Sequence, residues 1–366
     1  MPKLNFSAGP GALPEQVLRA ARDAIEEIPE LGISVLGVSH RSDWFRQVVL
    51  ECEQHVRALL QLPDSTHVLL LQGGSSLQFS MIPMLLLRGR KQPAEYLDTG
   101  YWSAMAIPEA RHEGAVRVLW SGREKGYRRL PSDAELAFSE QASYLHYVSN
   151  ETVEGLQFKR VLGHDGVPRV SDMSSDFLSG PIDVERFDLI YAHSQKNLGP
   201  AGVTLVVLKD QLLEHAPSDL PTILDYRPHA ERHSIYNTPP VFAIYAVLLV
   251  LRWLRFEVGG LTEMSAINSA KAERLYRCID ADPDFYQPRA ATSDRSKMNA
   301  VFNLPTPDLQ ERFIREAEQA GLLGLTGHRS LGGVRVSLYN GVTLEAVETL
   351  CGFMDAFRER GGLGTC

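Results

Sequence analysis

A single lysine stands between two apolar runs near the middle of the chain. Lys196 follows residues 187–192, which predict a buried strand, and precedes a second apolar run at 203–208. The polar turn between the two runs ends in Gly-Pro-Ala-Gly at 199–202. Burial lowers the pKa of a lysine and exposes the lone pair with which its amine attacks a carbonyl carbon. A solvated turn lysine is the ordinary interpretation, because most lysines are exposed. The residues elsewhere in the chain decide between a reactive buried lysine and a solvated turn lysine.

Four other strand ends carry residues whose chemistry complements that of Lys196. Gly73-Gly74-Ser75-Ser76 lies between an apolar run and a helical pattern, where free backbone N–H groups bind anions. Asp172 ends the run at 169–173, Trp102 follows the run at 94–98, and Thr152 follows the run at 143–149. Taken singly, these residues have plain structural interpretations as a loop, a helix cap and a core aromatic. Taken together, a phosphate-type loop, a flat aromatic, a carboxylate and an amine match the needs of pyridoxal phosphate. The glycine-rich turn matches neither the P-loop nor the dinucleotide pattern, so nothing supports nucleotide binding.

The elements that must position these residues alternate along the chain. Strands are predicted at 67–71, 94–98, 115–120, 143–149, 169–173, 188–192 and 203–208, with helices at 77–87 and 102–112. This alternation is typical of βαβ units, so we expect an α/β fold with a mostly parallel sheet flanked by helices. After residue 240 the pattern gives helices at 241–258 and 261–279. A smaller α+β unit follows, with strands at 298–304 and 334–339 and helices at 308–319 and 344–360. We therefore expect a large domain at 16–260 and a small domain formed by 261–366 with segment 1–15.

Composition narrows the class of protein. The chain has 366 residues and a formal net charge of −8, which disfavours nucleic acid as a partner. Four scattered cysteines, Cys52, Cys278, Cys351 and Cys366, predict unpaired thiols in a reducing compartment. The longest apolar run, 241–251, is too short to cross a bilayer, and the first residues lack the apolar core of a signal peptide. These features predict a cytoplasmic protein with no membrane partner, and we assign no metal site.

Longer motifs occur in order along nearly the whole chain. They are Asn5-Phe6-Ser7-Ala8-Gly9-Pro10, Val38-Ser39-His40-Arg41, Gly100-Tyr101-Trp102, His146-Tyr147-Val148-Ser149-Asn150-Glu151-Thr152, Gln195-Lys196-Asn197, Asn237-Thr238-Pro239-Pro240, Gly327-His328-Arg329 and Gly332-Gly333-Val334-Arg335-Val336-Ser337-Leu338-Tyr339-Asn340. With these motifs the chain resembles the phosphoserine aminotransferases, a class V (fold-type I) family of enzymes that depend on pyridoxal phosphate. The combination of Asn-Glu-Thr, Gln-Lys-Asn and Asn-Thr-Pro-Pro separates this family from other class V families.

The resemblance implies a role for each matching residue. Lys196 would form the Schiff base with the cofactor, Asp172 would pair with its protonated pyridine nitrogen, Trp102 would stack on the ring, and Thr152 would bond on the ring-hydroxyl side. The cofactor phosphate would be bound by Ser75, Ser76 and Gln195, together with Asn237 and Thr238 of the partner subunit in a homodimer. The substrate would be bound by Arg335 at its α-carboxylate and by His40, Arg41, His328 and Arg329 at its distal anion.

The implied reaction is reversible transfer of an amino group in L-serine biosynthesis. L-Glutamate and 3-phosphohydroxypyruvate would give phosphoserine and 2-oxoglutarate, and some bacterial relatives are thought also to serve pyridoxine synthesis. The chain departs from the family at Ser76, where some members carry arginine, and at Ala8, where others carry serine. Both departures bear on distal-anion binding.

Three alternatives remain open. A cysteine desulfurase needs a nucleophilic cysteine near the site, but Cys351 and Cys52 fall in helical patterns and Cys366 is the last residue. An alanine–glyoxylate type of aminotransferase would prefer alanine to glutamate. An aminotransferase-like domain without catalysis would hold no cofactor, although it would then have no reason to keep Lys196, Asp172 and Trp102.

Overall fold

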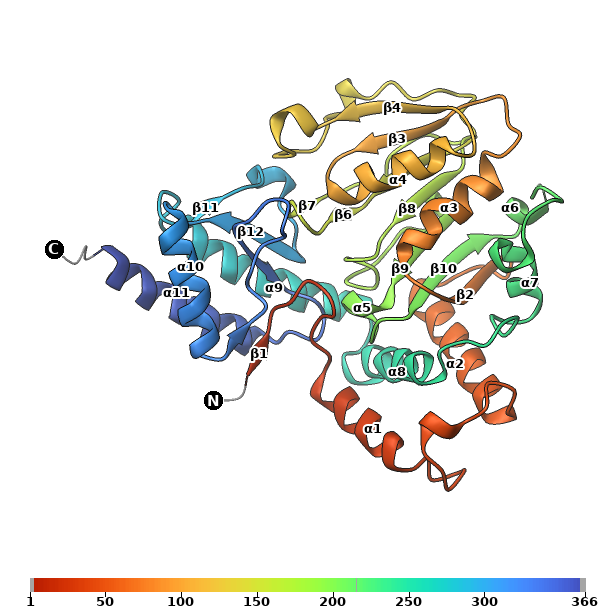
Figure 1. The fold of residues 1–366 in the computed structure, drawn as a ribbon, viewed down its shortest axis with the longest axis horizontal. Coiled ribbons are helices and arrows are strands. Elements are labelled where there is room, and N and C mark those ends of the chain that lie inside the picture. The colour runs from red at the N-terminus through yellow and green to blue at the C-terminus, as the bar shows by residue number, and fades with distance from the viewer. Residues whose placement is uncertain (1–2, 215, 363–366) are drawn as a thin grey trace.

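The computed structural model describes residues 3–214 and 216–362. Its centre is a seven-stranded sheet in the order β2-β10-β9-β8-β5-β3-β4 (Figure 1). The strands are β2 (Thr66–Gln72), β3 (Ala94–Asp98), β4 (Val116–Ser121), β5 (Leu145–Val148), β8 (Arg169–Asp172), β9 (Leu189–His193) and β10 (Val203–Lys209). Strand β10 is antiparallel to both neighbours, and the other adjacent pairs are parallel. The predicted mostly parallel sheet is confirmed, and the six strands other than β10 end at the same edge.

Helices cover both faces of this sheet. One face carries α3 (Ser75–Leu86), α4 (Tyr101–Arg111), α6 (Gln211–Glu214) and α7 (Tyr226–Glu231), and the other carries α2 (Asp43–Leu60) and α8 (Val241–Arg252). Alternate residues of one strand serve the two faces: Val68 and Leu70 pack with α2 and α8, whereas Leu69 and Leu71 pack with α3. Burial on both faces explains why the strands read as continuous apolar runs.

The N-terminal helices pack around α8. Helix α1 (Glu15–Glu26) and the 3₁₀ turn η1 (Val35–Gly37) both contact α8. Helix α2 begins where Ser42 Oγ accepts the N–H of Phe45 at 3.2 Å and ends at Gln61, which adopts a left-handed φ of 54°. The helix predicted at 241–258 is α-helical to Arg252 and continues as a π-helical turn, η6 (Trp253–Glu257).

The C-terminal unit has a separate hydrophobic core. It contains α9 (Leu261–Asp280), β11 (Gln287–Pro288), β12 (Asn299–Asn303), α10 (Pro307–Gln319), β14 (Val334–Ser337) and α11 (Leu344–Gly362). Strand β1 (Leu4–Asn5) joins this unit by pairing with β13 (Leu322–Leu323), and Phe6 lies in its core. Helix α9 links the cores, because Leu261 is buried with the sheet cluster and Leu275 with the C-terminal cluster. The domain boundary between residues 260 and 261 stays a prediction.

Specific polar contacts hold the two units together at the edge where the parallel strands end. A short hairpin, β6 (Asn150–Glu151) and β7 (Leu156–Gln157), projects from this edge towards the C-terminal unit (Figure 1). Asn150 Nδ2 donates to Asn299 Oδ1 at 2.8 Å, and the N–H of Ser296 donates to the carbonyl of Gly155 at 2.9 Å. The N–H of Asn340 also donates to Asn197 Oδ1 at 3.0 Å. Residues beside the predicted site are therefore fixed from both units.

A buried lysine stabilises the C-terminal unit from within. Lys271 Nζ, on α9, donates to the carbonyls of Leu338, Tyr339 and Val342, each at 2.9 Å. The side chain is fully buried, and burial lowers the pKa of Lys271 to about 7. Three carbonyl acceptors match the three N–H groups of an ammonium ion. Lys271 thus joins α9 to the segment that follows β14.

The remaining described elements are short. They are the 3₁₀ turns η2 (Arg123–Lys125), η3 (Asp133–Glu135), η4 (Val184–Arg186), η5 (Thr222–Leu224) and η7 (Thr292–Asp294) and the helical turn α5 (Ser194–Asn197). Cys52, Cys278 and Cys351 are free and buried, as predicted, whereas the prediction for Cys366 lies outside the described residues. Over residues 3–214 and 216–362, no helix is long and apolar enough to cross a membrane. The same residues contain no group of three or more His, Cys, Asp or Glu side chains that could hold a metal ion.

Candidate active site

A pocket opens at the edge of the sheet where the parallel strands end. It has about 480 Å³ of empty space, its open part included. The lining comes from the ends of β2, β3, β5, β8 and β9 and from the residues that follow them: Gly74, Ser75, Ser76, Trp102, Val148, Asn150, Asp172, Ser174, His193, Gln195 and Lys196. In open α/β sheets, this carboxyl edge is where ligands bind. The structure therefore brings together the lysine, carboxylate, aromatic and serines that the sequence singled out.

Lys196 is buried in the pocket wall. The predicted polar turn is the single helical turn α5, in which Ser194, Lys196 and Asn197 are all buried. Lys196 Nζ donates to Thr152 Oγ1 at 2.8 Å and lies 5.2 Å from the ring centroid of Trp102. Burial lowers the pKa of Lys196 to about 8, Asp172 acts in the opposite direction, and Arg335 lowers it further. An amine with such a pKa is partly neutral near pH 8 and can act as a nucleophile or a base.

Asp172 is the last residue of β8 and is buried at the pocket floor. Its Oδ1 accepts the N–H of Ser174 at 2.8 Å, and Tyr191 provides a side-chain hydrogen bond. Burial raises the pKa of Asp172, whereas the charge of Lys196 and the hydrogen bonds lower it. Behind it, Tyr191 Oη is 2.9 Å from Nε2 of His146, and burial lowers the pKa of His146 to about 3. Hydrogen bonds thus fix the carboxyl group of Asp172, and the neutral imidazole of His146 lies behind it next to Tyr191.

The predicted anion site is at the start of α3. Gly74 is the residue before the helix, and Ser75 and Ser76 are its first two residues, so their backbone N–H groups have no partner within the helix. Ser75 Oγ lies 2.8 Å from Ser174 Oγ, which in turn accepts the N–H of His193 at 3.2 Å. Free N–H groups and two hydroxyls suit a phosphate group.

Trp102 and Thr152 form the opposite wall. Thr152 is buried in the turn between β6 and β7, where its hydroxyl meets Lys196. Trp102 is in the first turn of α4, and its Nε1 is buried without a hydrogen-bond partner among the described residues. A flat ring with an unused donor beside a buried amine is suited to a planar, polar ligand.

Two arginines and a histidine from the C-terminal unit lie together near the pocket. Arg335 is on β14 and is half-buried, and its Nε is buried without a partner among the described residues. Arg335 and Arg329, together with burial, lower the pKa of His328, so the three side chains are neighbours. The ring of His328 lies 4.7 Å from that of Tyr101, which directly precedes Trp102. This arrangement brings anion-binding groups to the side of Lys196.

Eight predicted residues lie outside the pocket lining of this chain. Thr152, His328, Arg329 and Arg335 are connected to the pocket by the contacts described above, and the other four are not. His40 and Arg41 lie between η1 and α2, where the N–H of Arg41 donates to Ser39 Oγ at 3.1 Å. Asn237 and Thr238 are exposed in the segment before α8. The structure brings Ser75, Ser76, Trp102, Thr152, Asp172, Gln195 and Lys196 together, and it does not bring these four to them.

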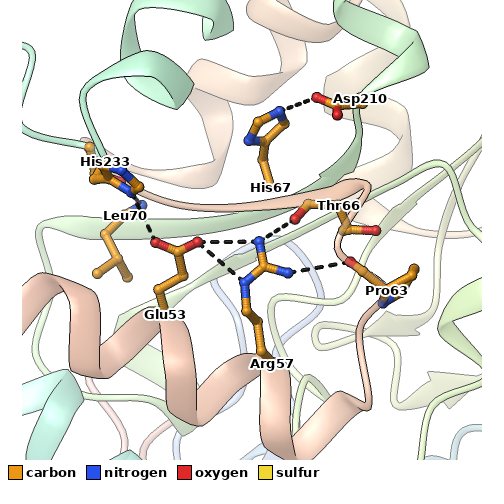
Figure 2. A network of polar contacts seen from close by, with 9 residues as sticks. Glu53, Arg57, Pro63, Thr66, His67, Leu70, Asp210 and His233 are labelled. Atoms are coloured by element: carbon orange, nitrogen blue, oxygen red, sulfur yellow. Dashed lines mark hydrogen bonds and ion pairs between the residues drawn. The ribbon is translucent and has the colours of Figure 1, made fainter.

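The segment that carries Asn237 is nevertheless well anchored at its start. His233 and Ser234 both adopt left-handed backbone conformations, with φ of 45° and 66°. Figure 2 shows how it is held: His233 contacts Glu53, and Glu53 also pairs with Arg57, which donates to the carbonyls of Pro63 and Thr66. Ser234 Oγ accepts the N–H of Leu70 on the edge strand β2 at 2.9 Å.

Sequence reasoning missed several residues of the site. Ser174 and His193 line the pocket, and each stands one or two residues from a residue that was singled out. Glu151 and Glu154, both fully buried, accept backbone N–H groups of α4. Two glutamates three residues apart, in a segment that follows a buried strand, were a signal available in the sequence.

The pocket fits pyridoxal phosphate in each of its chemical requirements. Lys196 supplies a partly neutral amine, Asp172 an anion, the start of α3 a phosphate cradle, and Trp102 a flat surface with an unpaired N–H. The cofactor needs each of these groups.

Known proteins resemble the chain over almost its full length. The family model described as "Aminotransferase class-V" matches residues 3–350. A curated phosphoserine aminotransferase of Laribacter hongkongensis is 48% identical, over 98% of this chain and 99% of its own. The solved structure of a phosphoserine aminotransferase from Bacillus circulans subsp. alkalophilus matches with a TM-score of 0.94 and 43% identity, covering 98% of this chain and 99% of that one. A phosphoserine aminotransferase from Trichomonas vaginalis, solved with pyridoxal phosphate bound, matches with a TM-score of 0.90 and 36% identity, over 96% and 99% of the two chains.

Proposed function

Since the chain belongs to the class-V aminotransferase family, we infer that it is a phosphoserine aminotransferase. It transfers an amino group reversibly between L-glutamate and 3-phosphohydroxypyruvate, giving O-phospho-L-serine and 2-oxoglutarate. One observation carries this conclusion: a buried lysine with a lowered pKa lies in a pocket that also supplies an anion and a phosphate cradle. The full-length similarity to curated phosphoserine aminotransferases sets the substrate.

We propose that seven residues of this chain hold pyridoxal phosphate. They are Ser75 and Ser76 with Gln195 at the phosphate, Trp102 on the ring face, Thr152 on the ring-hydroxyl side, Asp172 at the pyridine nitrogen and Lys196 at the aldehyde carbon. The bound cofactor supplies an electron-withdrawing ring that stabilises negative charge at the substrate α-carbon. Asp172 keeps the pyridine nitrogen protonated, because an opposite charge in a buried site favours the protonated form.

Lys196 moves the proton in this mechanism. Its amine would accept the α-proton of the amino donor and return it at the aldehyde carbon of the cofactor, which is general acid–base work by a positioned group. With a pKa of about 8, the amine can both take and release a proton near neutral pH. Thr152 orients Nζ through the 2.8 Å hydrogen bond.

We propose that Arg335 binds the substrate α-carboxylate and that His328 and Arg329 bind the distal anion. Support comes from the unpartnered Nε of Arg335 and from the mutual proximity of the two arginines and His328. A planar guanidinium serves both a carboxylate and a phosphate, so one set of residues can accept glutamate and phosphoserine in turn.

We also propose a homodimer in which His40, Arg41, Asn237 and Thr238 complete the site of the partner subunit. All four lie outside the lining of their own pocket. The N-terminal region also exposes a run of large apolar side chains on α1 and the following segment: Leu18, Ile25, Leu31, Ile33 and Leu36. An exposed apolar patch of this kind is typical of an interface. Gel filtration coupled to light scattering should give twice the chain mass; a monomer would contradict the proposal. We further propose a cytoplasmic location, in keeping with the free Cys52, Cys278 and Cys351.

The function is tested by visible absorption of the purified protein loaded with pyridoxal phosphate. Phosphoserine and glutamate, added separately, should each convert the aldehyde form of the cofactor to its amine form. If glutamate alone does so, the chain remains an aminotransferase and the phosphoserine assignment fails. Stronger conversion by alanine than by glutamate would favour the alanine–glyoxylate alternative, and release of sulfide from cysteine would favour a desulfurase. A protein that takes up no cofactor would contradict the whole assignment.

A further inference from the structure

We propose that Glu151 and Glu154 act together as positioning residues, and that this carboxyl pair, which holds one proton between its two members, fixes Trp102 in the pocket wall. The proposal deepens the proposed function and depends on it only for the identity of the ligand that Trp102 faces. Neither glutamate lines the pocket, so neither is a catalytic residue.

The pair caps α4 from another part of the chain. Glu151 Oε2 accepts the N–H of Trp102 and Glu151 Oε1 accepts the N–H of Ser103, both at 3.1 Å. Glu154 Oε1 accepts the N–H of Tyr101 at 3.0 Å. The first N–H groups of a helix have no partner within it, and a negative charge there also favours the helix dipole. Two side chains of the β6–β7 hairpin therefore satisfy three successive backbone groups around Trp102.

Gly100 shows how closely the two carboxyl groups approach. A Cβ added to this glycine would lie 2.5 Å from Glu154 Oε2 and 2.6 Å from Glu151 Cδ. The carboxyl groups are therefore at most about 5 Å apart, with no room for a side chain between them and the backbone. Both side chains are buried, Glu151 completely and Glu154 to 2% exposure. Two carboxylates this close in a buried site cannot both be ionised without a large cost, so one of them holds a proton.

The hydrogen bonds decide which member is charged. Glu151 accepts from two backbone N–H groups and from Thr99 Oγ1 at 3.2 Å, which suits a carboxylate. Glu154 has a single acceptor contact, and its Oε2 is buried without a partner among the described residues. Burial and the charge of Glu151 raise the pKa of Glu154 to about 9. Burial raises the pKa of Glu151 to about 7, so Glu151 is the member of the pair that ionises first and Glu154 is the neutral acid at neutral pH.

Other charged groups face the pair from several elements. Burial and, to a smaller extent, the charge of Asp172 on β8 raise the pKa of Glu151, and Lys196 on α5 lies within range of the charge of Glu151. Arg289, which follows β11, lowers the pKa of Glu154. The charge of Glu154 also acts on Arg335 on β14 and on Tyr127, which follows β4. Above pH 9 the ionised Glu154 would repel Glu151 and weaken the cap.

The pair also connects Trp102 to the chemistry. Thr152, which holds Lys196, stands between the two glutamates in the same hairpin turn. The ring of Trp102 lies over the same Lys196 Nζ, and Tyr101 contacts His328. A shift at the start of α4 would therefore move the stacking ring relative to Lys196.

The test compares substitutions that remove charge, hydrogen bonding or both. Glu154→Ala should weaken pyridoxal phosphate binding about tenfold, and Glu154→Gln should restore it to within about twofold, since an amide keeps the single acceptor and remains neutral. Glu151→Gln should bind pyridoxal phosphate about tenfold more weakly than the unsubstituted protein, because its NH₂ group would face a backbone N–H. In the cofactor-free protein, the amides of Trp102 and Ser103 should exchange with deuterium about tenfold faster in Glu151→Gln. The exposed Glu140→Gln is the matched control.

A pH series separates positioning from a merely structural role. Cofactor affinity of the unsubstituted protein should fall above pH 9, and this fall should be absent from Glu154→Gln. Lys196 titrates in both proteins, so the difference between their curves reports Glu154. Equal effects of glutamine at the two positions, or a Glu151→Gln protein with unchanged exchange and affinity, would overturn the proposal. If Glu151→Gln does not fold, the comparison of Glu154→Ala with Glu154→Gln decides alone. All binding measurements use pyridoxal phosphate without an amino donor, so a failure of the phosphoserine assignment would leave them interpretable.

Discussion

Replacing Thr152 by valine tests the environment of Lys196 directly. The two side chains have nearly the same shape, so Thr152→Val removes only the hydroxyl, which accepts the 2.8 Å hydrogen bond from Lys196 Nζ and also contacts Tyr339. A hydrogen bond to a charged group contributes about 1.5–3 kcal/mol. If the neutral amine of Lys196 also bonds to the hydroxyl, the ammonium form is favoured over the amine by roughly half of that energy. Because 1.36 kcal/mol corresponds to one pKa unit, the pKa of Lys196 should fall by about one unit from its value of about 8. The pKa falls because removal of the hydrogen bond destabilises the ammonium form more than the neutral amine.

Reductive methylation of the cofactor-free protein measures this shift. The fraction of Lys196 modified is followed by mass spectrometry from pH 5 to pH 10, with peptides carrying exposed lysines as the reference. The midpoint for Lys196 should move to lower pH in Thr152→Val and stay in place in Thr152→Ser, which keeps the hydroxyl. A midpoint that does not move, or that rises, would refute the hydrogen bond as a determinant of this pKa.

The remaining predictions concern catalysis and stability. Lys196→Ala should abolish turnover in a coupled assay of phosphoserine formation while leaving the far-ultraviolet circular dichroism unchanged; retained activity would contradict the mechanism. Asp172→Asn should lower kcat at least about a hundredfold, because a neutral amide cannot keep the pyridine nitrogen protonated; a smaller loss would argue that another group does so. Lys271→Met should lower the free energy of unfolding by about 3 kcal/mol in denaturant titrations, since three buried carbonyls lose their donors, with the exposed Lys91→Met as control. The lowered pKa of Lys271 means that the unfolded chain binds more protons between about pH 7 and pH 10.5, so its contribution to stability rises with pH over that window and should be absent from the variant. Gly155→Ala places a Cβ 2.8 Å from the carbonyl oxygen of Asn299 at a φ of 74°, so it should destabilise the protein by about 1–3 kcal/mol; Gly166→Ala, with a similar φ and open space, should cost less, and equal costs would mean that backbone strain alone matters.

Most of the sheet could be predicted because its strands are buried on both faces. The strand at 94–98 was placed with the bounds that the structure gives it, and the other six lie within two residues of their predicted bounds at either end. Such strands leave an unbroken apolar run between polar turns, which is the strongest local signal a sequence offers. The helical turn at Lys196 was predicted as a polar turn, since four residues give no helical period.

Contacts between distant segments account for what sequence reasoning missed. Glu151 and Trp102 are 49 residues apart, and only the folded chain shows that the carboxylate caps α4. The hydroxyl of Ser174 contacts the hydroxyl of Ser75, which lies 99 residues earlier in the chain. Nothing in the local pattern of either residue records such a partner. For His40 and Asn237 the limit is different, because the role proposed for them depends on the proposed second subunit.

The contact between Asn340 and Asn197 has a consequence for the newly made chain. Lys196 leaves the ribosome well before Asn340, because synthesis proceeds from the N-terminus. Until the last strand and the loop after it have emerged, the residue next to Lys196 lacks its partner and the β6–β7 hairpin has no C-terminal unit to pack against. The final positioning of the residues beside Lys196 therefore arises late, when almost the whole chain has been made. A prematurely ended chain would keep its lysine and the residues that line the pocket, but not the contacts with Asn299 and Asn340 that fix Asn150 and Asn197.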